Sequence, residues 1–174
     1  MEVGHVGLFV RNLDAMCEFY IRHFGFTVTD SVRGPERSIV FLTTDPTSHH
    51  QLVLVTGRPD GEEPKLMNQL SFRLKTLSEL RRVYAQFVDD GVGGLDPITH
   101  GIAWSVYLPD PEGNRIEAYV DTPWYITQPF RVPIDLSKSE ADLLTETEAL
   151  CRAAPGFEPV GEWTRRIAQH IRAL

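Results

Sequence analysis

Residues 100–117 read HGIAWSVYLPDPEGNRIE, and this stretch decides how the rest of the chain is interpreted. Its Asp-Pro-Glu-Gly centre, residues 110–113, predicts a tight turn, because proline presets φ at the second turn position and glycine tolerates a left-handed exit. β-Branched and aromatic residues are enriched on both sides of that centre, as hairpin strands require. The stretch therefore predicts a β-hairpin.

The second strand of this hairpin carries Glu117 among apolar residues. Side chains alternate between the two faces of a strand, so Glu117 shares a face with Arg115 and Tyr119, while residues 116, 118 and 120 take the other face. Two interpretations remain open at this point. Glu117 is either a solvated carboxylate on an exposed face or a functional group.

The composition excludes several classes of protein. The chain has 174 residues, of which 42% are hydrophobic and 24% charged, as expected of a globular protein. Its net charge of −7 argues against nucleic acid as a partner, since phosphate binding needs a basic patch. No leader pattern and no run of about 20 apolar residues occurs, so we expect a cytoplasmic protein without a membrane segment. Two cysteines, Cys17 and Cys151, are too few for a disulfide scaffold.

The hydrophobic periodicity predicts the same order of elements twice. Residues 3–10 predict a strand, and a helix from Leu13 to Phe24 closed by Gly25 follows. After a connector, a strand at 69–74 precedes a helix that begins at Leu77, with Thr76 and Glu79 as a capping box, and ends at Gly91. The remaining strands are predicted at 26–32, 38–43, 51–55 and 94–99 and in the hairpin.

These elements indicate one βαβββ module used twice, about 1–57 and 66–121, within a domain of residues 1–121. A constant offset of 64 relates His5 to Gln69, Leu8 to Phe72, Val10 to Leu74, Leu13 to Leu77 and Tyr20 to Tyr84. At the end of each module we pair Gln51 with Glu117, an offset of 66 that one longer loop would explain.

Residues 122–174 predict an arm of different character. Its first part is aromatic and interrupted by proline, which favours an extended segment. Ser137 and Glu140 then suggest a capped helix that reaches Ala154, and a second helix is expected from Trp163 to Ile171. We assign this arm no chemistry.

If the two modules face each other around a pseudo-two-fold axis, four polar side chains converge inside one curved sheet. They are His5, Gln51, Gln69 and Glu117. A histidine and a carboxylate are good ligands for a divalent first-row metal, and a glutamine carbonyl is a weaker one. The sequence therefore predicts a metal site that is poor in strong ligands.

Over roughly residues 1–121 the doubled module resembles the vicinal oxygen chelate superfamily, which includes glyoxalases, bleomycin resistance proteins and extradiol dioxygenases. The hairpin resembles the extradiol dioxygenase motif at His100, Val106-Tyr107, Asp110-Pro111, Gly113 and Glu117. The resemblance implies an α+β fold in which two βαβββ modules form a curved mixed sheet around a central cavity, followed here by a partly helical arm.

The resemblance also implies roles for individual residues. Glu117 would be the carboxylate of a 2-His-1-carboxylate site for Fe(II), or alternatively Mn, and His5 one of its histidines. His100 and Tyr107 would transfer protons and orient a bound catechol. The second histidine is expected where this chain has Gln69. His49, on the strand face of Gln51, is an alternative imidazole.

Three functions remain open. The first is a metal-dependent extradiol dioxygenase-like enzyme that acts on a catechol-type or other vicinal-oxygen substrate. The second is a glyoxalase-like lyase or isomerase, against which Gln51 counts because that position would have to supply a carboxylate base. The third is a small-molecule binding protein with weak or no metal binding, because Gln69 replaces the expected histidine. The expected partners are a small aromatic or vicinal-oxygen ligand and a second copy in a homodimer.

Overall fold

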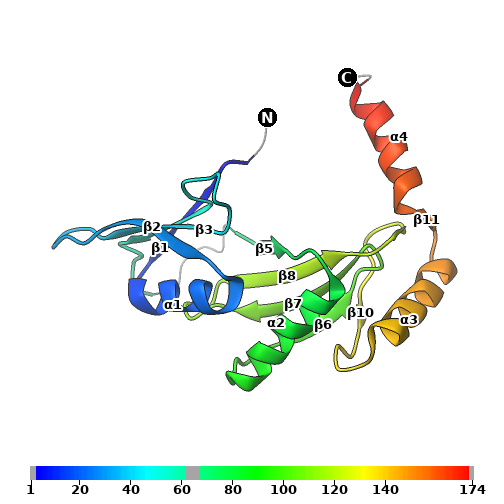
Figure 1. Cartoon of the computed structure of the whole chain (residues 1–174), viewed down its shortest axis with the longest axis horizontal. Helices are drawn as coiled ribbons and strands as arrows, with labels where there is room; N and C mark the ends of the chain where they lie inside the picture. The colour runs from blue at the N-terminus through cyan, green and yellow to red at the C-terminus, as the bar shows by residue number, and fades with distance from the viewer. Residues whose placement is uncertain (1–2, 62–66, 173–174) are drawn as a thin grey trace. The chain divides into compact units, whose positions relative to one another are not determined.

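The computed structural model describes residues 3–61 and 67–172 (Figure 1). Its elements follow the predicted order, βαβββ twice and then the arm. They are β1 (Val6–Val10), α1 (Leu13–Phe24), β2 (Thr27–Val32), β3 (Ile39–Thr43), β4 (Leu52–Thr56), β5 (Leu70–Arg73), α2 (Leu77–Asp89), β6 (Asp96–Thr99), β7 (Ala103–Pro109), β8 (Arg115–Asp121), β9 (Trp124–Tyr125), β10 (Val132–Pro133), α3 (Glu140–Ala153), β11 (Glu158–Pro159) and α4 (Val160–Arg172).

The chain forms two compact units, each with a sheet of its own. Unit 1 comprises Met1–Leu70 and Pro109–Arg115, and unit 2 comprises Ser71–Leu108 and Ile116–Leu174. One sheet has the order β1-β4-β3-β2, a second the order β10-β6-β7-β8-β5, and β11 and β9 form a small two-stranded sheet. In the first two of these sheets the first strand of a module pairs with its last strand, so the predicted α+β fold of two βαβββ modules with C-terminal helices is confirmed.

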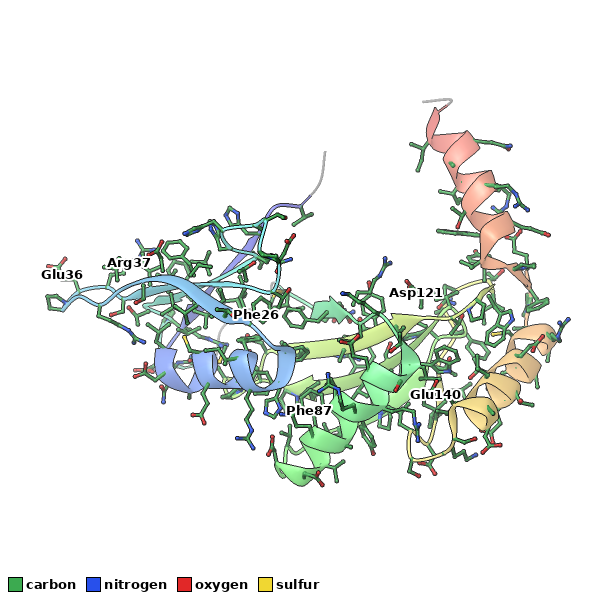
Figure 2. The ribbon with its side chains drawn as sticks, in the orientation of Figure 1. Phe26, Glu36, Arg37, Phe87, Asp121 and Glu140 are labelled. Atoms are coloured by element: carbon green, nitrogen blue, oxygen red, sulfur yellow. The ribbon has the colours of Figure 1, made fainter. Side chains whose placement is uncertain are left out.

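Unit 1 is built around α1, which begins and ends as its sequence predicts. The side chain of Asn12 accepts a hydrogen bond from the Ala15 N–H, and Gly25 closes the helix with a φ of 68°. Met16 and Tyr20 are fully buried, and Cys17 is buried as well. Burial raises the pKa of the Cys17 thiol. Glu36 and Arg37 lie at the far end of the β2–β3 hairpin (Figure 2).

In unit 2, α2 begins at Leu77 as predicted and buries one side of the helix. The Thr76 hydroxyl accepts from the Glu79 N–H at 3.1 Å, which confirms the N-terminal cap. Phe87, labelled in Figure 2, and Val83 are buried, whereas Val88 is 52% exposed. A helix of 3.6 residues per turn brings positions 80, 83 and 87 to one side, and position 88 lies past the edge of that stripe.

The arm departs from its predicted form at both helices. The α3 cap is Ser139, whose hydroxyl accepts from the Asp142 N–H at 3.1 Å, so the prediction of Ser137 was wrong. Ser137 instead donates to Asp135. The last helix begins at Val160, three residues before the predicted start. Within residues 3–61 and 67–172, no helix combines the length and apolar content needed to cross a membrane.

The first and last strands of the two modules have the same offset, and this corrects one predicted pairing. The Val6 N–H donates to the Gln51 carbonyl and the Leu74 N–H to the Tyr119 carbonyl. Both bonds join residues 45 positions apart, and β5 and β8 run in the same direction (Figure 1). The first strands differ by 64, so the last strands also differ by 64. Glu117 therefore corresponds to Val53, and its pairing with Gln51 was wrong by two residues.

The turn after β7 is held by Asp110, which is 4% exposed. Its Oδ1 accepts from the N–H groups of Glu112 at 3.0 Å and Asn114 at 2.9 Å. Its Oδ2 accepts from the Tyr20 hydroxyl of α1 at 3.0 Å. The Asp-Pro-Glu-Gly turn is thereby confirmed, and its aspartate also ties the turn to the first helix of unit 1.

We expect Tyr20→Phe to lower the free energy of unfolding at pH 7 by about 1–2 kcal/mol, because it removes a buried hydrogen bond to a carboxylate. Burial and the nearby Asp110 raise the pKa of Tyr20 far above its usual range. Above pH about 10 the unfolded chain releases the phenol proton while the folded chain retains it, so this stabilisation is lost as the pH rises. Urea unfolding from pH 7 to 11 measures both effects.

Tyr84→Phe is the matched control, because Tyr84 occupies the equivalent position of α2 and is only half-buried. Removal of a hydroxyl from a half-buried side chain costs little, and we expect the free energy of unfolding to change by less than about 0.5 kcal/mol. A difference between wild type and Tyr20→Phe that stays constant up to pH 11 would contradict the assignment.

Candidate functional site

The carboxylate of Glu117 is buried at the middle of β8. Its side chain lies on the face opposite Ile116 and Ala118, as predicted, but it is only 7% exposed. The Ser71 hydroxyl of β5 donates to Oε2 at 2.6 Å, and the Ser105 hydroxyl of β7 donates to Oε1 at 2.8 Å. Glu117 is therefore not a solvated surface carboxylate, and the two strands that flank β8 fix its orientation.

His100 and Tyr107 form a hydrogen-bonded pair in the same unit. His100 Nδ1 lies 2.8 Å from the Phe130 carbonyl oxygen, and its Nε2 lies 3.1 Å from the Tyr107 hydroxyl. A carbonyl oxygen only accepts, so Nδ1 carries the proton of the neutral ring and Nε2 accepts from the tyrosine. Tyr107 and Ser105 lie two positions apart on β7 and share a face. The pair and the Glu117 carboxylate thus belong to one face of the unit 2 sheet.

In unit 1 the predicted His5 lies among other histidines. Its ring centroid is 4.4 Å from that of His50, and His50 Nδ1 is 2.8 Å from His49 Nδ1. His49 Nε2 in turn contacts the Asp30 carboxylate at 2.9 Å. Desolvation and the neighbouring His5 and His49 lower the pKa of His50. His49, the alternative imidazole, therefore makes its contacts with Asp30 and His50.

Gln51 is used within its own loop. Its Oε1 accepts from the Thr44 N–H at 2.9 Å and from the Thr44 hydroxyl at 2.8 Å. These bonds close the segment between β3 and β4. The predicted convergence of Gln51 with the other polar positions is not supported by these contacts, which give its amide oxygen a structural role.

Gln69, which precedes β5, is half-buried, and its Oε1 accepts from the Asn68 side-chain amide at 3.3 Å. His5 and Gln69 belong to unit 1 and Glu117 to unit 2. Their assignment to a single metal stays a prediction. In the part of the chain that the structure describes, no group of three or more His, Cys, Asp or Glu side chains is arranged to hold a metal ion.

Three features of the site were missed by sequence reasoning: the hydroxyls of Ser71 and Ser105 and the carbonyl of Phe130. The two serines had a usable signal, because each lies two positions from a predicted site residue on a strand, Ser71 from Gln69 and Ser105 from Tyr107. A backbone carbonyl supplied by the arm has no signal in a sequence. The arm, to which the sequence assigned no chemistry, thus contacts His100.

Comparisons with known proteins agree with this fold. A family model described as the Glyoxalase/Bleomycin resistance protein/Dioxygenase superfamily matches residues 2–118. The chain is 33% identical over 126 residues to biphenyl-2,3-diol 1,2-dioxygenase 3 of Rhodococcus globerulus, a match that covers 69% of this chain and 63% of that protein. The chain thus spans less than two thirds of that relative's length.

Two solved structures share the fold at low identity. A glyoxylase/bleomycin resistance protein/dioxygenase domain from Frankia sp. EAN1pec has a TM-score of 0.60 at 22% identity, covering 70% of this chain and 93% of that one. The fosfomycin resistance protein FosX of Listeria monocytogenes, complexed with Mn(II) and a sulfate ion, has a TM-score of 0.55 at 17% identity over 70% of this chain and 93% of that one. Proteins that share this fold thus include one that binds a divalent metal.

We expect Gln51→Met to loosen the loop before β4 and leave metal binding unchanged. The Thr44 amide loses its acceptor, and its hydrogen exchange should accelerate by about 10-fold, as expected for one lost hydrogen bond. Exchange of the Val53 amide serves as the internal reference, because β4 is paired on both sides. Loss of bound metal in this variant would restore Gln51 as a ligand.

Proposed function

The chain belongs to the glyoxalase/bleomycin resistance protein/dioxygenase superfamily, and we propose that it binds a small catechol-type diol and cleaves its ring with O₂, as an extradiol dioxygenase-like enzyme. The observation that carries this proposal is the His100–Tyr107 pair, with its fixed tautomer, on the sheet face of Glu117. The relative at 33% identity is named for a diol of this kind.

The donor types in the chain fit a divalent first-row metal. His5 offers an imidazole, Gln69 an amide oxygen and Glu117 a carboxylate, and we propose these three as the protein ligands of Fe(II), or of Mn as the second choice. The hydrogen bonds that Ser71 and Ser105 donate to Glu117 are of the kind that commonly orients metal-binding carboxylates. Such a metal, when bound, supplies a centre that holds and activates the diol and O₂. The amide at position 69 predicts weaker metal binding than an imidazole.

The proton chemistry follows from the hydrogen bonds of the pair. His100 keeps its proton at Nδ1 through the Phe130 carbonyl, which leaves the Nε2 lone pair facing the Tyr107 hydroxyl. A diol hydroxyl beside Tyr107 can therefore pass its proton to the phenol oxygen while the phenol proton moves to His100 Nε2. Deprotonation prepares the diol to bind a cation, and the reverse transfer returns the proton to the product.

A metal-free or weakly metal-binding protein that holds a small ligand is the second candidate, and Gln69 favours it because an amide replaces the expected imidazole. A glyoxalase-like lyase or isomerase is less well supported. It needs a carboxylate base in the first module, and the position equivalent to Glu117 is Val53. Binding of 2,3-dihydroxybiphenyl that is equal in chelator-treated and metal-loaded protein, without O₂ uptake, would favour the second candidate.

We expect Gln69→His to raise the affinity for Fe(II) by about 10-fold or more, since imidazole is a stronger ligand than an amide, and Glu117→Ala to abolish binding. Metal titration of the full chain, followed by elemental analysis, measures both. Asn68→His is the matched control, because it adds the same imidazole one position away. Equal metal occupancy in all four proteins would show that the ligand assignment is wrong.

We expect Tyr107→Phe to lower kcat for O₂ uptake with 2,3-dihydroxybiphenyl by roughly 100-fold, the usual contribution of a positioned acid–base group, with little change in KM. Tyr119→Phe is the control, since the Tyr119 hydroxyl accepts from Arg73 at 3.2 Å and has no part in the proposed transfer. A wild-type kcat in Tyr107→Phe would remove this pair from the mechanism.

A further inference from the structure

The arm makes a set of hydrogen bonds around His100 that hold both its ring and its backbone. The Phe130 carbonyl accepts a hydrogen bond from His100 Nδ1–H at 2.8 Å, and the Gln128 side-chain amide donates to the His100 carbonyl at 2.9 Å. The Gln128 Oε1 also accepts from the Phe130 N–H at 3.2 Å. Gln128 therefore bridges the backbone of the residue that carries the proposed base and the backbone that supplies its carbonyl partner.

We infer that arm residues 126–133 are the element that selects the tautomer of His100, with Gln128 as a positioning residue. This inference rests on the proposed function only in treating His100–Tyr107 as the acid–base pair. The segment lies beyond residues 2–118, which the family model matches, so the match assigns it no role.

The carbonyl of Phe130 selects one tautomer because the other brings two acceptors together at Nδ1 and reverses the hydrogen bond to Tyr107. With the proton on Nε2, the bare Nδ1 would face the lone pairs of the Phe130 carbonyl at 2.8 Å. The Nε2–H would also meet the Tyr107 hydroxyl, which would then have to accept and turn its own proton elsewhere. With the proton on Nδ1, both contacts are ordinary hydrogen bonds, and Nε2 is ready to receive a proton from Tyr107.

Strand pairing anchors the C-terminal end of this segment to β6, the strand that precedes His100. In β10, Val132 and Pro133 pair with Thr99 and Ile98 of β6, and the Ile134 N–H donates to the Pro97 carbonyl at 3.1 Å. Arg131 forms an ion pair with Asp96 at the exposed edge. Strand pairing thus holds the arm beside β6, and the hydrogen bonds of Gln128 position the Phe130 carbonyl.

The test uses the full chain labelled with ¹⁵N in its histidines. Long-range ¹H–¹⁵N spectra at neutral pH distinguish the two tautomers of each imidazole, and His100→Gln identifies the His100 signal. We expect protonated Nδ1 for His100 in the wild type. In Gln128→Ala we expect a mixture of both tautomers, with kcat for O₂ uptake lowered roughly 3- to 10-fold at unchanged KM, because the variant loses both hydrogen bonds of the Gln128 bridge, each of modest net contribution.

Two further variants keep the test decisive. Arg131→Ala removes an exposed ion pair of the same segment and should leave both the tautomer and kcat unchanged, because such pairs contribute little. Gln128→Glu keeps the acceptor for the Phe130 N–H but sets a carboxylate oxygen against the His100 carbonyl, so it should shift the tautomer at least as far as Gln128→Ala.

A wild-type spectrum with protonated Nε2, or a Gln128→Ala spectrum identical to wild type, would overturn the inference. A different result would separate it from the proposed function. If the tautomer shifts as expected while the metal-loaded wild type consumes no O₂ with any catechol, the positioning role stands and the dioxygenase proposal fails.

Discussion

The site depends on a carboxylate that is buried between two hydroxyls. A carboxylate removed from water is costly unless hydrogen bonds compensate it, and Glu117 receives one from each strand that flanks β8. Ser71 and Ser105 can meet it only because β8 lies between β5 and β7. Tyr107 lies on the same face of β7 as Ser105, so one sheet face carries both the carboxylate and the His100–Tyr107 pair.

Local patterns were sufficient for most of the fold. Gly25 adopts the left-handed conformation that its place after a helical stripe predicts, and Asp110 closes the turn that the Asp-Pro-Glu-Gly segment predicts. The repeated order of strand and helix also follows from periodicity, because each element is encoded within a few turns of its own sequence. The face of Glu117 could likewise be predicted from alternation alone.

Longer-range features could not be predicted in this way. The pairing of Gln51 with Glu117 was wrong by two residues, and a shift of two leaves every side chain of a strand on the same face, so alternation cannot detect it. Only the backbone bonds from Val6 to Gln51 and from Leu74 to Tyr119 reveal the true offset. The α3 cap shows a similar limit. Ser137 and Ser139 each have an acidic residue three positions later, so both fit a capping pattern. In the structure the Ser137 N–H donates to Asp135, and Ser139 caps the helix.

The common offset of the first and last strands also shows that the two modules repeat the same strand pairing and differ in the side chains it carries. Where the second module carries Ser71, Ser105, Tyr107 and Glu117, the first carries Gly7, Phe41, Thr43 and Val53. Of these four positions all are polar in the second module and one, Thr43, is polar in the first, and the second module's sheet is the one to which the arm adds β10. An added strand covers the open edge of β6, which protects the sheet from unwanted pairing. Because β6 ends directly before His100, the strand that covers this edge also leads the chain past the imidazole, and a structural extension thereby gains a position from which it controls the proton of the site.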